Sequence, residues 1–324
     1  MLQSVAAGVV TDGDWMFAIQ LAARFRSLSF ANALLVDYQH AQAYRQGRVG
    51  VPWPSLVGTR RQWETLGCRA GRGQHGYLIH EPVTTRHATW APGDPGSWRV
   101  LGPRERPRPG EAVQTRVTGM RTTTVWDVSQ MSPDSPVPVV SSPVVRAGAT
   151  PDGLWAGLVH VAAMEGYTVR DVSGGPQEGA ADPKAQTITV GIDATPAARA
   201  QTLAHHLAHI LMHDPRSDAV RSHRGLAEVE AQSVAVMIVA AHGMPADCYT
   251  LPPVTTWARD VEGHTPMGVV LATGEKVRRT ATSVLTLVET RQTSGGMLAT
   301  PAVRQEPGLP VLCPAPPVSM VVGG

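Results

Sequence analysis

A short histidine-rich segment constrains the fold more than any other feature of the sequence. Residues 202–213 read TLAHHLAHILMH, and Thr195-Pro196, just upstream, supplies an N-cap residue and a proline at the first helical position. We expect one helix from there to the end of the segment. On that helix His205 and His209 lie one turn apart on the same face, where two imidazole nitrogens can meet one zinc ion at about 2.0–2.1 Å. The apolar residues between them anchor the helix in a core.

A second helix, downstream, offers the third metal ligand. It is expected over about 225–242 and carries the segment AEVEAQS. Glu228 follows His209 by 19 residues, enough for a loop, a reversal and a helical return. Glu230 is the competing ligand, because it points roughly 200° away around the same helix and only one of the two can face the metal. The sequence therefore predicts a Zn²⁺ site with two histidines and one glutamate.

Two further histidines of the first helix lie off the ligand face. His213 is roughly 12 Å along the axis from His205, too far to share its ion, and is expected beside the site or at the helix end. His206 stands where the zincin pattern H-E-x-x-H has the glutamate that takes a proton from zinc-bound water. Histidine can accept a proton, but its ring has a different reach and lacks the negative charge. His206 is thus either a replacement for the catalytic base or a tolerated polar residue.

Charge divides the chain into two unlike halves. Residues 1–150 carry 16 arginines and 10 acidic residues, whereas residues 151–324 carry 12 basic and 16 acidic residues. A basic half suits a polyanion such as nucleic acid, although an arginine-rich solvated surface gives the same composition. The three cysteines lie far apart and form no CxxC pair, so neither a disulfide framework nor a thiolate zinc site is expected. We expect a cytoplasmic protein with no signal peptide and no membrane span.

Hydrophobic periodicity and turn residues predict an α+β chain of two domains. Helices are expected at 14–26, 29–46, 59–66, 152–165, 196–213, 225–242 and 274–291. Strands are expected at 77–83, 97–101, 113–118, 121–128, 167–172 and 187–190. The segment at 92–111 is rich in Pro, Gly and Arg and is expected to form a mobile loop. The second domain is the more helical of the two.

A stretch with five prolines and little periodicity, residues 132–151, reads as the linker between the domains. It separates a first domain over 1–131 from a second over 152–291. The tail, 292–324, is rich in Pro and Gly and is expected to be disordered.

The first domain holds a candidate surface for single-stranded DNA. Single strands are bound by cations on phosphates and by aromatic faces on bases. Arginines and aromatic residues gather in one stretch of the sequence: Arg60, Arg61, Trp63, Arg69, Arg72 and Tyr77. The alternatives are that Trp63 packs in a core and that the arginines form a solvated face.

Motifs in both domains resemble known families. The second domain resembles the ImmA/IrrE-type metallopeptidases, whose TLAHELAH and E-x-E-A-x-S read TLAHHLAH and EVEAQS here. The first resembles the N-terminal region of ArdC-type antirestriction proteins in SFANALLVDYQ, in GTRRQWETLGCRAGRGQHGYLIHEPV and in TTTVWDVSQM. The resemblance covers about residues 14–130 and 152–290.

The resemblance implies an N-terminal domain that binds single-stranded DNA and a C-terminal zincin-like domain. Proteins of this kind are carried by mobile elements and protect incoming DNA from restriction. It further implies His205, His209 and Glu228 as ligands, with Gln232 where an acidic residue often supports the site. Because the glutamate base is absent, a pseudoenzyme is expected; an active zinc endopeptidase with a substitute base and a non-catalytic scaffold for a partner protein are the alternatives.

Overall fold

The computed structural model describes residues 8–9, 11–137, 148–173, 179–213, 224–245, 253–259, 261 and 263–294. Contacts between residues divide the chain into two compact units. The first unit comprises residues 1–34 and 138–324, and the second comprises residues 35–137. This division differs from the linear one expected from the sequence, because the N-terminal residues group with the C-terminal ones. Half of the expected linker, residues 138–147, and nearly all of the expected tail lie outside the described residues.

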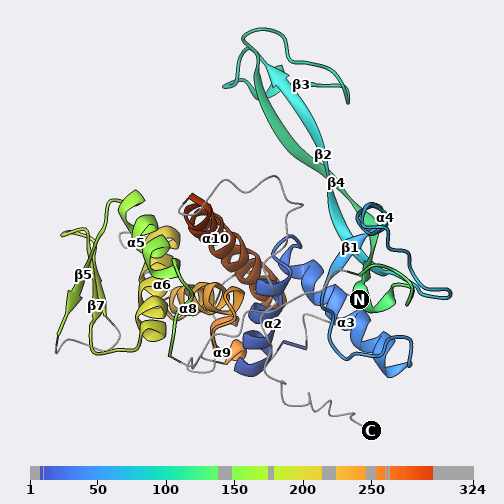
Figure 1. Ribbon diagram of the computed structural model, residues 1–324. Helices are drawn as coiled ribbons and strands as arrows, with labels where there is room; N and C mark the ends of the chain where they lie inside the picture. The colour runs from blue at the N-terminus through green and yellow to red at the C-terminus, as the bar shows by residue number, and fades with distance from the viewer. Residues whose placement is uncertain are drawn as a thin grey trace. The chain divides into compact units, whose positions relative to one another are not determined.

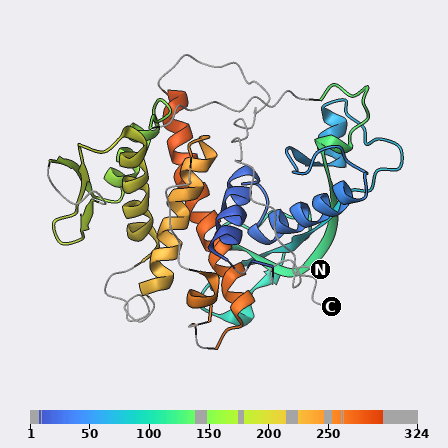
Figure 2. The ribbon, with the colours of Figure 1, turned by 90° about the horizontal axis from the view of Figure 1, so that it is seen from below.

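The first unit is built around helix α8 (Arg224–Ala241). Its apolar run Val234–Val239 is fully buried, as is typical of a helix that is hydrophobic all round. Helix α6 (Pro196–Met212), helix α10 (Pro266–Ser294) and helix α2 (Asp12–Arg24) all pack on it. Figure 2 shows α8 running between α6 and α10. This unit is therefore a helical layer with the histidine helix on one flank.

Helix α2 belongs to this unit because its aromatic side chain reaches across it. The indole N–H of Trp15 donates to Ser233 Oγ of α8 at 2.9 Å, and both residues are fully buried. The Trp15 ring also contacts the rings of Phe30 and Trp257. Trp257 lies on helix α9 (Val254–Trp257), which the sequence did not predict. An indole N–H buried without an acceptor would cost free energy, so this hydrogen bond ties α2 to the core.

A small sheet lies against the other side of α6. Its strands β5 (Thr168–Val172), β7 (Thr187–Gly191) and β6 (Ala180–Asp182) follow the order β5-β7-β6. The first pair is parallel and the second pair is antiparallel. Helix α5 (Leu154–Met164) comes directly before β5 in the chain. Helix α6 begins as expected, with Thr195 Oγ1 accepting from Ala198 N at 3.3 Å and Pro196 at the first position.

The second unit is a four-stranded antiparallel sheet in the order β1-β4-β2-β3. Strands β2 (Tyr77–Thr89) and β4 (Ala112–Asp127) pair over their whole length, with a bulge at Val83/Thr84. Figure 1 shows these two strands extending as a long arm, with the short β3 (Arg99–Val100) near its end. Helix α3 (Phe30–Arg45), most of which lies in this unit, and helix α4 (Arg60–Thr65) pack near the base of the arm, beside β1 (Val57–Thr59).

A buried aspartate organises the base of this sheet. Both carboxylate oxygens of Asp127 accept hydrogen bonds, one from the backbone N–H of Ser55 (2.7 Å) and Leu56 (3.2 Å), the other from the N–H and hydroxyl of Ser129. Gln130 accepts in return from the Asp127 N–H at 3.0 Å. The motif WDVSQ thus closes a one-turn helix, η2 (Val128–Gln130), by a reciprocal capping box.

Several expectations need correction. The segment at 92–111 contains a 3₁₀ turn that was not expected, η1 (Pro95–Ser97), and strand β3, which lies within the strand expected at 97–101. The strands expected at 113–118 and 121–128 form the single strand β4. Helix α10 begins eight residues earlier than the expected 274. The mixed α+β class is confirmed, and none of the described helices is long and apolar enough to cross a membrane.

Candidate functional site

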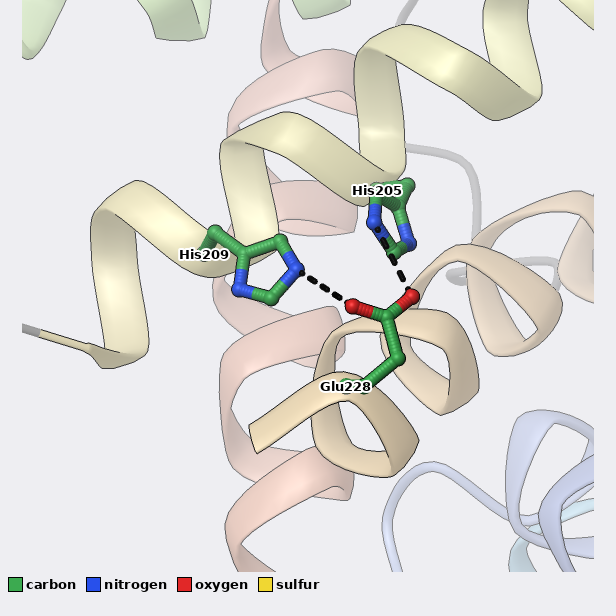
Figure 3. Close-up of side chains that lie close together, drawn as sticks. All are labelled: His205, His209 and Glu228. Carbon is green, nitrogen blue, oxygen red and sulfur yellow. Dashed lines mark hydrogen bonds and ion pairs between the residues drawn. The ribbon is translucent and has the colours of Figure 1, made fainter. Parts of the chain in front are cut away.

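Two histidines and a glutamate converge where α6 packs on α8. His205 Nε2 lies 3.4 Å from Glu228 Oε1, and His209 Nε2 lies 3.2 Å from Glu228 Oε2 (Figure 3). One nitrogen or oxygen of each residue lies within 4.8 Å of those of the other two. A tetrahedral ion with bonds of 2.0–2.1 Å separates its ligand atoms by about 3.3 Å, so the distance of each histidine from Glu228 fits such an ion. The Glu228 side chain is 56% exposed, which leaves the site open to solvent.

Glu230, the competing third ligand, has a different role in the structure. Its side chain is buried and points away from the two ligand-face histidines, toward His213 and Lys276. His213 Nε2 lies 2.7 Å and Lys276 Nζ 2.6 Å from the same oxygen, Glu230 Oε2. Burial alone would raise the pKa of Glu230, but these two hydrogen bonds outweigh it and lower the pKa. Glu230 is therefore an ionised anchor beside the site.

This anchor fixes one proton on the neighbouring histidine. An ionised carboxylate only accepts, so His213 Nε2 carries a proton and donates it to Glu230. His213 Nδ1 lies 3.2 Å from His209 Nδ1, and which of the two donates depends on the tautomers of the rings. When His209 donates from Nδ1, its Nε2 presents a lone pair toward Glu228 Oε2, 3.2 Å away, and a metal ion can bind both atoms. When the proton is on Nε2, His209 donates it to Glu228.

The electrostatics of the other two members suit a metal ligand. Burial lowers the pKa of His205 to about 4, against the opposing effect of Glu228, so its imidazole is neutral near pH 7. The hydrogen bond with His209 holds the pKa of Glu228 below its usual range. A neutral imidazole and an ionised carboxylate are the forms in which these side chains bind metals.

The remaining expected site residues flank the three converging side chains. Gln232 lies close enough to His205 to affect its pKa, yet His205 Nδ1, which is buried, has no hydrogen-bond partner among the residues that the structure describes. His206 lies outside the three-residue group: a Cβ added to Gly179, at the edge of the small sheet, would lie 3.3 Å from its Nε2. His206 therefore points toward the small sheet.

The expected DNA-binding residues separate into two sets. Arg60, Arg61, Arg69 and Arg72 are exposed on the surface of the second unit. Trp63 and Tyr77, by contrast, are buried, and their polar atoms have intramolecular partners. Trp63 Nε1 donates to the Trp126 carbonyl at 2.9 Å, and the Tyr77 hydroxyl lies 3.1 Å from His40 Nδ1. The expectation that bases stack on these two rings is therefore corrected, because both rings pack in the core.

Sequence reasoning missed two groups of residues. Lys276 became part of the site only through the packing of α10 on α8, and no local pattern marked it. Two tryptophans lie beside arginines in the segment at 92–111 and its flanks: the exposed Trp90, whose ring centre is 5.4 Å from Arg108, and the half-buried Trp98, whose ring centre is 5.0 Å from Arg116. The richness of that segment in arginine was a usable signal, but it was attributed to a mobile loop.

No protein-family model matches the chain, and no curated protein matches it. Two crystal structures of the antirestriction protein ArdC from plasmid R388 are similar to it, each at 16% sequence identity. The match with the metal-free structure covers 80% of this chain and 85% of the ArdC chain, with a TM-score of 0.48. The match with the Mn(II)-bound structure covers 89% of this chain and 98% of the ArdC chain, with a TM-score of 0.49. By themselves these values assign neither an activity nor a metal to this chain.

Proposed function

We propose that this chain is an ArdC-like, antirestriction-type protein that binds a divalent metal in its first unit and single-stranded DNA in its second. The observation that carries the metal proposal is the meeting of Glu228 with the Nε2 atoms of His205 and His209 at 3.2–3.4 Å. A divalent cation between these atoms would be bound by both imidazoles and by the carboxylate.

Zinc is the metal that this donor set fits best. Two histidines and one glutamate are typical of zinc sites that keep a fourth position open, and Glu228 lies at the solvent-exposed side. A zinc ion held there would supply Lewis-acid chemistry. The chain's own residues hold two imidazoles and one carboxylate in place, and Glu230 supports the ring of His209 through His213.

We infer that the site binds metal without efficient peptide hydrolysis. The position of the general base is taken by His206, which has no carboxylate and points toward the small sheet. General bases contribute about 10²–10⁴-fold to rates, so their loss leaves a peptidase fold with little turnover. The active endopeptidase is the competing function, and zinc-dependent cleavage of an unfolded protein by the wild type would establish it.

The metal proposal is tested by metal content. Purified chain is loaded with zinc, desalted and analysed by mass spectrometry, alongside His209→Ala and Glu228→Ala. The wild type is expected to retain one zinc ion per chain and both variants to lose it. His160→Ala, on helix α5 of the same unit, is the control and is expected to retain the ion. Equal zinc in all four proteins would contradict the proposal.

Support for DNA binding comes from the basic N-terminal half and from the exposed arginines of the second unit. Contacts to phosphates make affinity fall steeply with salt, with a slope of about −0.7 per contact for single strands. Titration of a labelled oligothymidylate over a series of salt concentrations is expected to show such a slope. No measurable binding at low salt would overturn this part of the proposal.

A further inference from the structure

The arm of the second unit is exposed on both faces. Every residue of β4 from Val113 to Thr122 is exposed, and so are most residues of β2 that pair with them. Apolar side chains are among them, with Val117 64% and Met120 62% exposed. A two-stranded ribbon is marginally stable alone and has no core of its own. Such an arm is suited to contact a partner rather than to support the fold.

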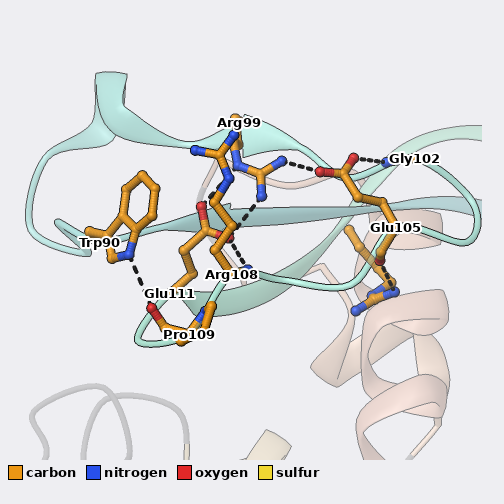
Figure 4. A network of polar contacts seen from close by, with 8 residues as sticks. Trp90, Arg99, Gly102, Glu105, Arg108, Pro109 and Glu111 are labelled. Atoms are coloured by element: carbon orange, nitrogen blue, oxygen red, sulfur yellow. Dashed lines mark hydrogen bonds and ion pairs between the residues drawn. The ribbon is translucent and has the colours of Figure 1, made fainter.

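The end of the arm, which we call the arm tip and define as residues 90–111, is a built structure. Arg99 donates to both oxygens of Glu111, at 2.9 and 2.8 Å, and to Glu105 at 2.5 Å (Figure 4). Glu105 also accepts from the Gly102 N–H, and Glu111 from the Arg108 N–H. These hydrogen bonds lower the pKa of both carboxyl groups. Arg99 therefore holds the tip's chain folded back on the ribbon.

The arm tip and the strand ends beside it carry an excess of positive charge. Residues 86–116 hold six arginines and three acidic residues, and two of the acidic residues are bound by Arg99. Arg104 and Arg106 are exposed, and their guanidinium groups make no ion pair with any residue that the structure describes. Arg108 is exposed as well and lies over the ring of Trp90. Three cations thus project from one short segment.

An exposed aromatic ring lies beside one of these cations. Trp90 is 58% exposed, the highest exposure of any tryptophan described, and Arg108 lies 5.4 Å from the centre of its ring. Its indole N–H donates to the Pro109 carbonyl at 3.3 Å, which fixes the ring against the folded-back segment (Figure 4). A fixed, exposed indole beside a guanidinium group has the features that bind unpaired bases and their phosphates.

We propose that the arm tip is the principal contact for single-stranded DNA, with a base stacked on Trp90 and phosphates bound by Arg104, Arg106 and Arg108. This inference rests on the proposed function, in that the chain must bind single strands at all. The proposed ligand is single-stranded DNA and not a duplex, because a base inside a duplex offers no free face for stacking on Trp90. Trp90 also supplies the aromatic contact that Trp63 and Tyr77, being buried, cannot provide.

Two variants of the arm tip separate the two contributions. The double variant Arg104→Ser/Arg106→Ser is expected to reduce the salt slope of binding by about 1.4, which is about 0.7 for each phosphate contact. Trp90→Ala is expected to weaken binding by about ten-fold with the slope unchanged, because stacking is not electrostatic. Trp90→Phe keeps an aromatic face and is expected to retain most of the affinity. The matched controls are Arg45→Ser and Tyr44→Ala, both exposed on helix α3, and they are expected to bind as the wild type does.

The outcomes distinguish this inference from the proposed function. Binding by the wild type, with unchanged affinity and slope in the arm-tip variants, would overturn the inference alone. No binding by the wild type at low salt would overturn the proposed function and the inference together. Equal affinity for a duplex, unaffected by Trp90→Ala, would overturn the commitment to single strands. The Arg99 network lies outside the substituted side chains, and circular dichroism checks that each variant folds.

Discussion

At the scale of single residues, the chemistry of the site depends on where the proton of His209 lies. Glu230 is buried and ionised, so His213 donates to it from Nε2, and His213 Nδ1 lies 3.2 Å from His209 Nδ1. With the proton of His209 on Nδ1, the lone pair of its Nε2 faces the space shared with Glu228. Residues that orient a ligand imidazole in this way commonly affect metal affinity by 10–100-fold.

The first prediction concerns His213. Replacing it with alanine removes the hydrogen-bond partner of His209 Nδ1, so the ring of His209 is no longer held in place and zinc affinity is expected to fall by about 10–100-fold. Competition with a chromophoric chelator measures that affinity. Urea unfolding of the metal-free protein serves as the check on structure. Unchanged affinity would show that the hydrogen bond at 3.2 Å does not orient the ligand.

The second prediction concerns the missing general base at position 206. If the missing carboxylate is what disables hydrolysis, His206→Glu should create zinc-dependent cleavage of an unfolded protein, since a general base contributes about 10²–10⁴-fold. Release of labelled fragments measures it, with His206→Gln as the control of similar size but no basicity. An inactive, zinc-loaded His206→Glu protein would mean that the defect extends beyond this side chain.

At the scale of elements, local patterns predict helices well and long-range contacts poorly. Helices α6 and α8 begin and end within a residue or two of their expected bounds, because capping residues and apolar periodicity are local signals. The choice between Glu228 and Glu230 was not local: it depended on the packing of α10, which brings Lys276 to Glu230. The order of the arm tip likewise depends on Arg99 meeting Glu111, a contact that no local pattern encodes.

The third prediction concerns the turn at the base of the arm. Asp127→Ala leaves the buried N–H groups of Ser55 and Leu56 without their acceptor, and we expect a loss of about 3 kcal/mol in the free energy of unfolding. Asp94→Ala is the matched control, since Asp94 caps only an exposed turn and should cost less than about 1 kcal/mol. Urea titration followed by circular dichroism compares them. Equal losses would contradict the structural role of the motif WDVSQ.

The fourth prediction concerns pH and the buried pair His40–Tyr77. Burial lowers the pKa of His40 below 6.5, against the opposing effects of the Val51 carbonyl and Asp127. The unfolded chain takes up a proton near pH 6.5 but the folded chain does so only at lower pH, so the stability contribution is present above 6.5 and lost as the pH falls. The drop in melting temperature from about pH 7.5 to about pH 5.5 should therefore be smaller in His40→Gln than in the wild type. Identical drops in melting temperature in the two proteins would contradict this role of His40.

At the scale of the whole molecule, two units carry two separate proposals. The sequence indicated two domains from a proline-rich stretch and a change of charge, both of which are linear signals. The structure groups residues 1–34 with the C-terminal part, because the indole of Trp15 is buried against Ser233. Contacts between residues more than two hundred positions apart cannot be derived from composition.

The fifth prediction follows from this separation of sites. His209→Ala is expected to abolish zinc retention while single-stranded DNA binding stays as in the wild type. The double variant Arg104→Ser/Arg106→Ser is expected to show the reverse. Zinc content and DNA affinity are measured for both proteins. Loss of zinc retention and of DNA binding together in either protein would show that the two sites are not independent.

The central claim is that His205, His209 and Glu228 bind one ion, and X-ray absorption at the zinc edge tests it most directly. The zinc-loaded chain is expected to show a four-coordinate shell of nitrogen and oxygen at about 2.0–2.1 Å, with the outer-shell scattering of two imidazoles. That scattering should be lost in His209→Ala. A shell that contains sulfur, or one without imidazole scattering in the wild type, would contradict the claim.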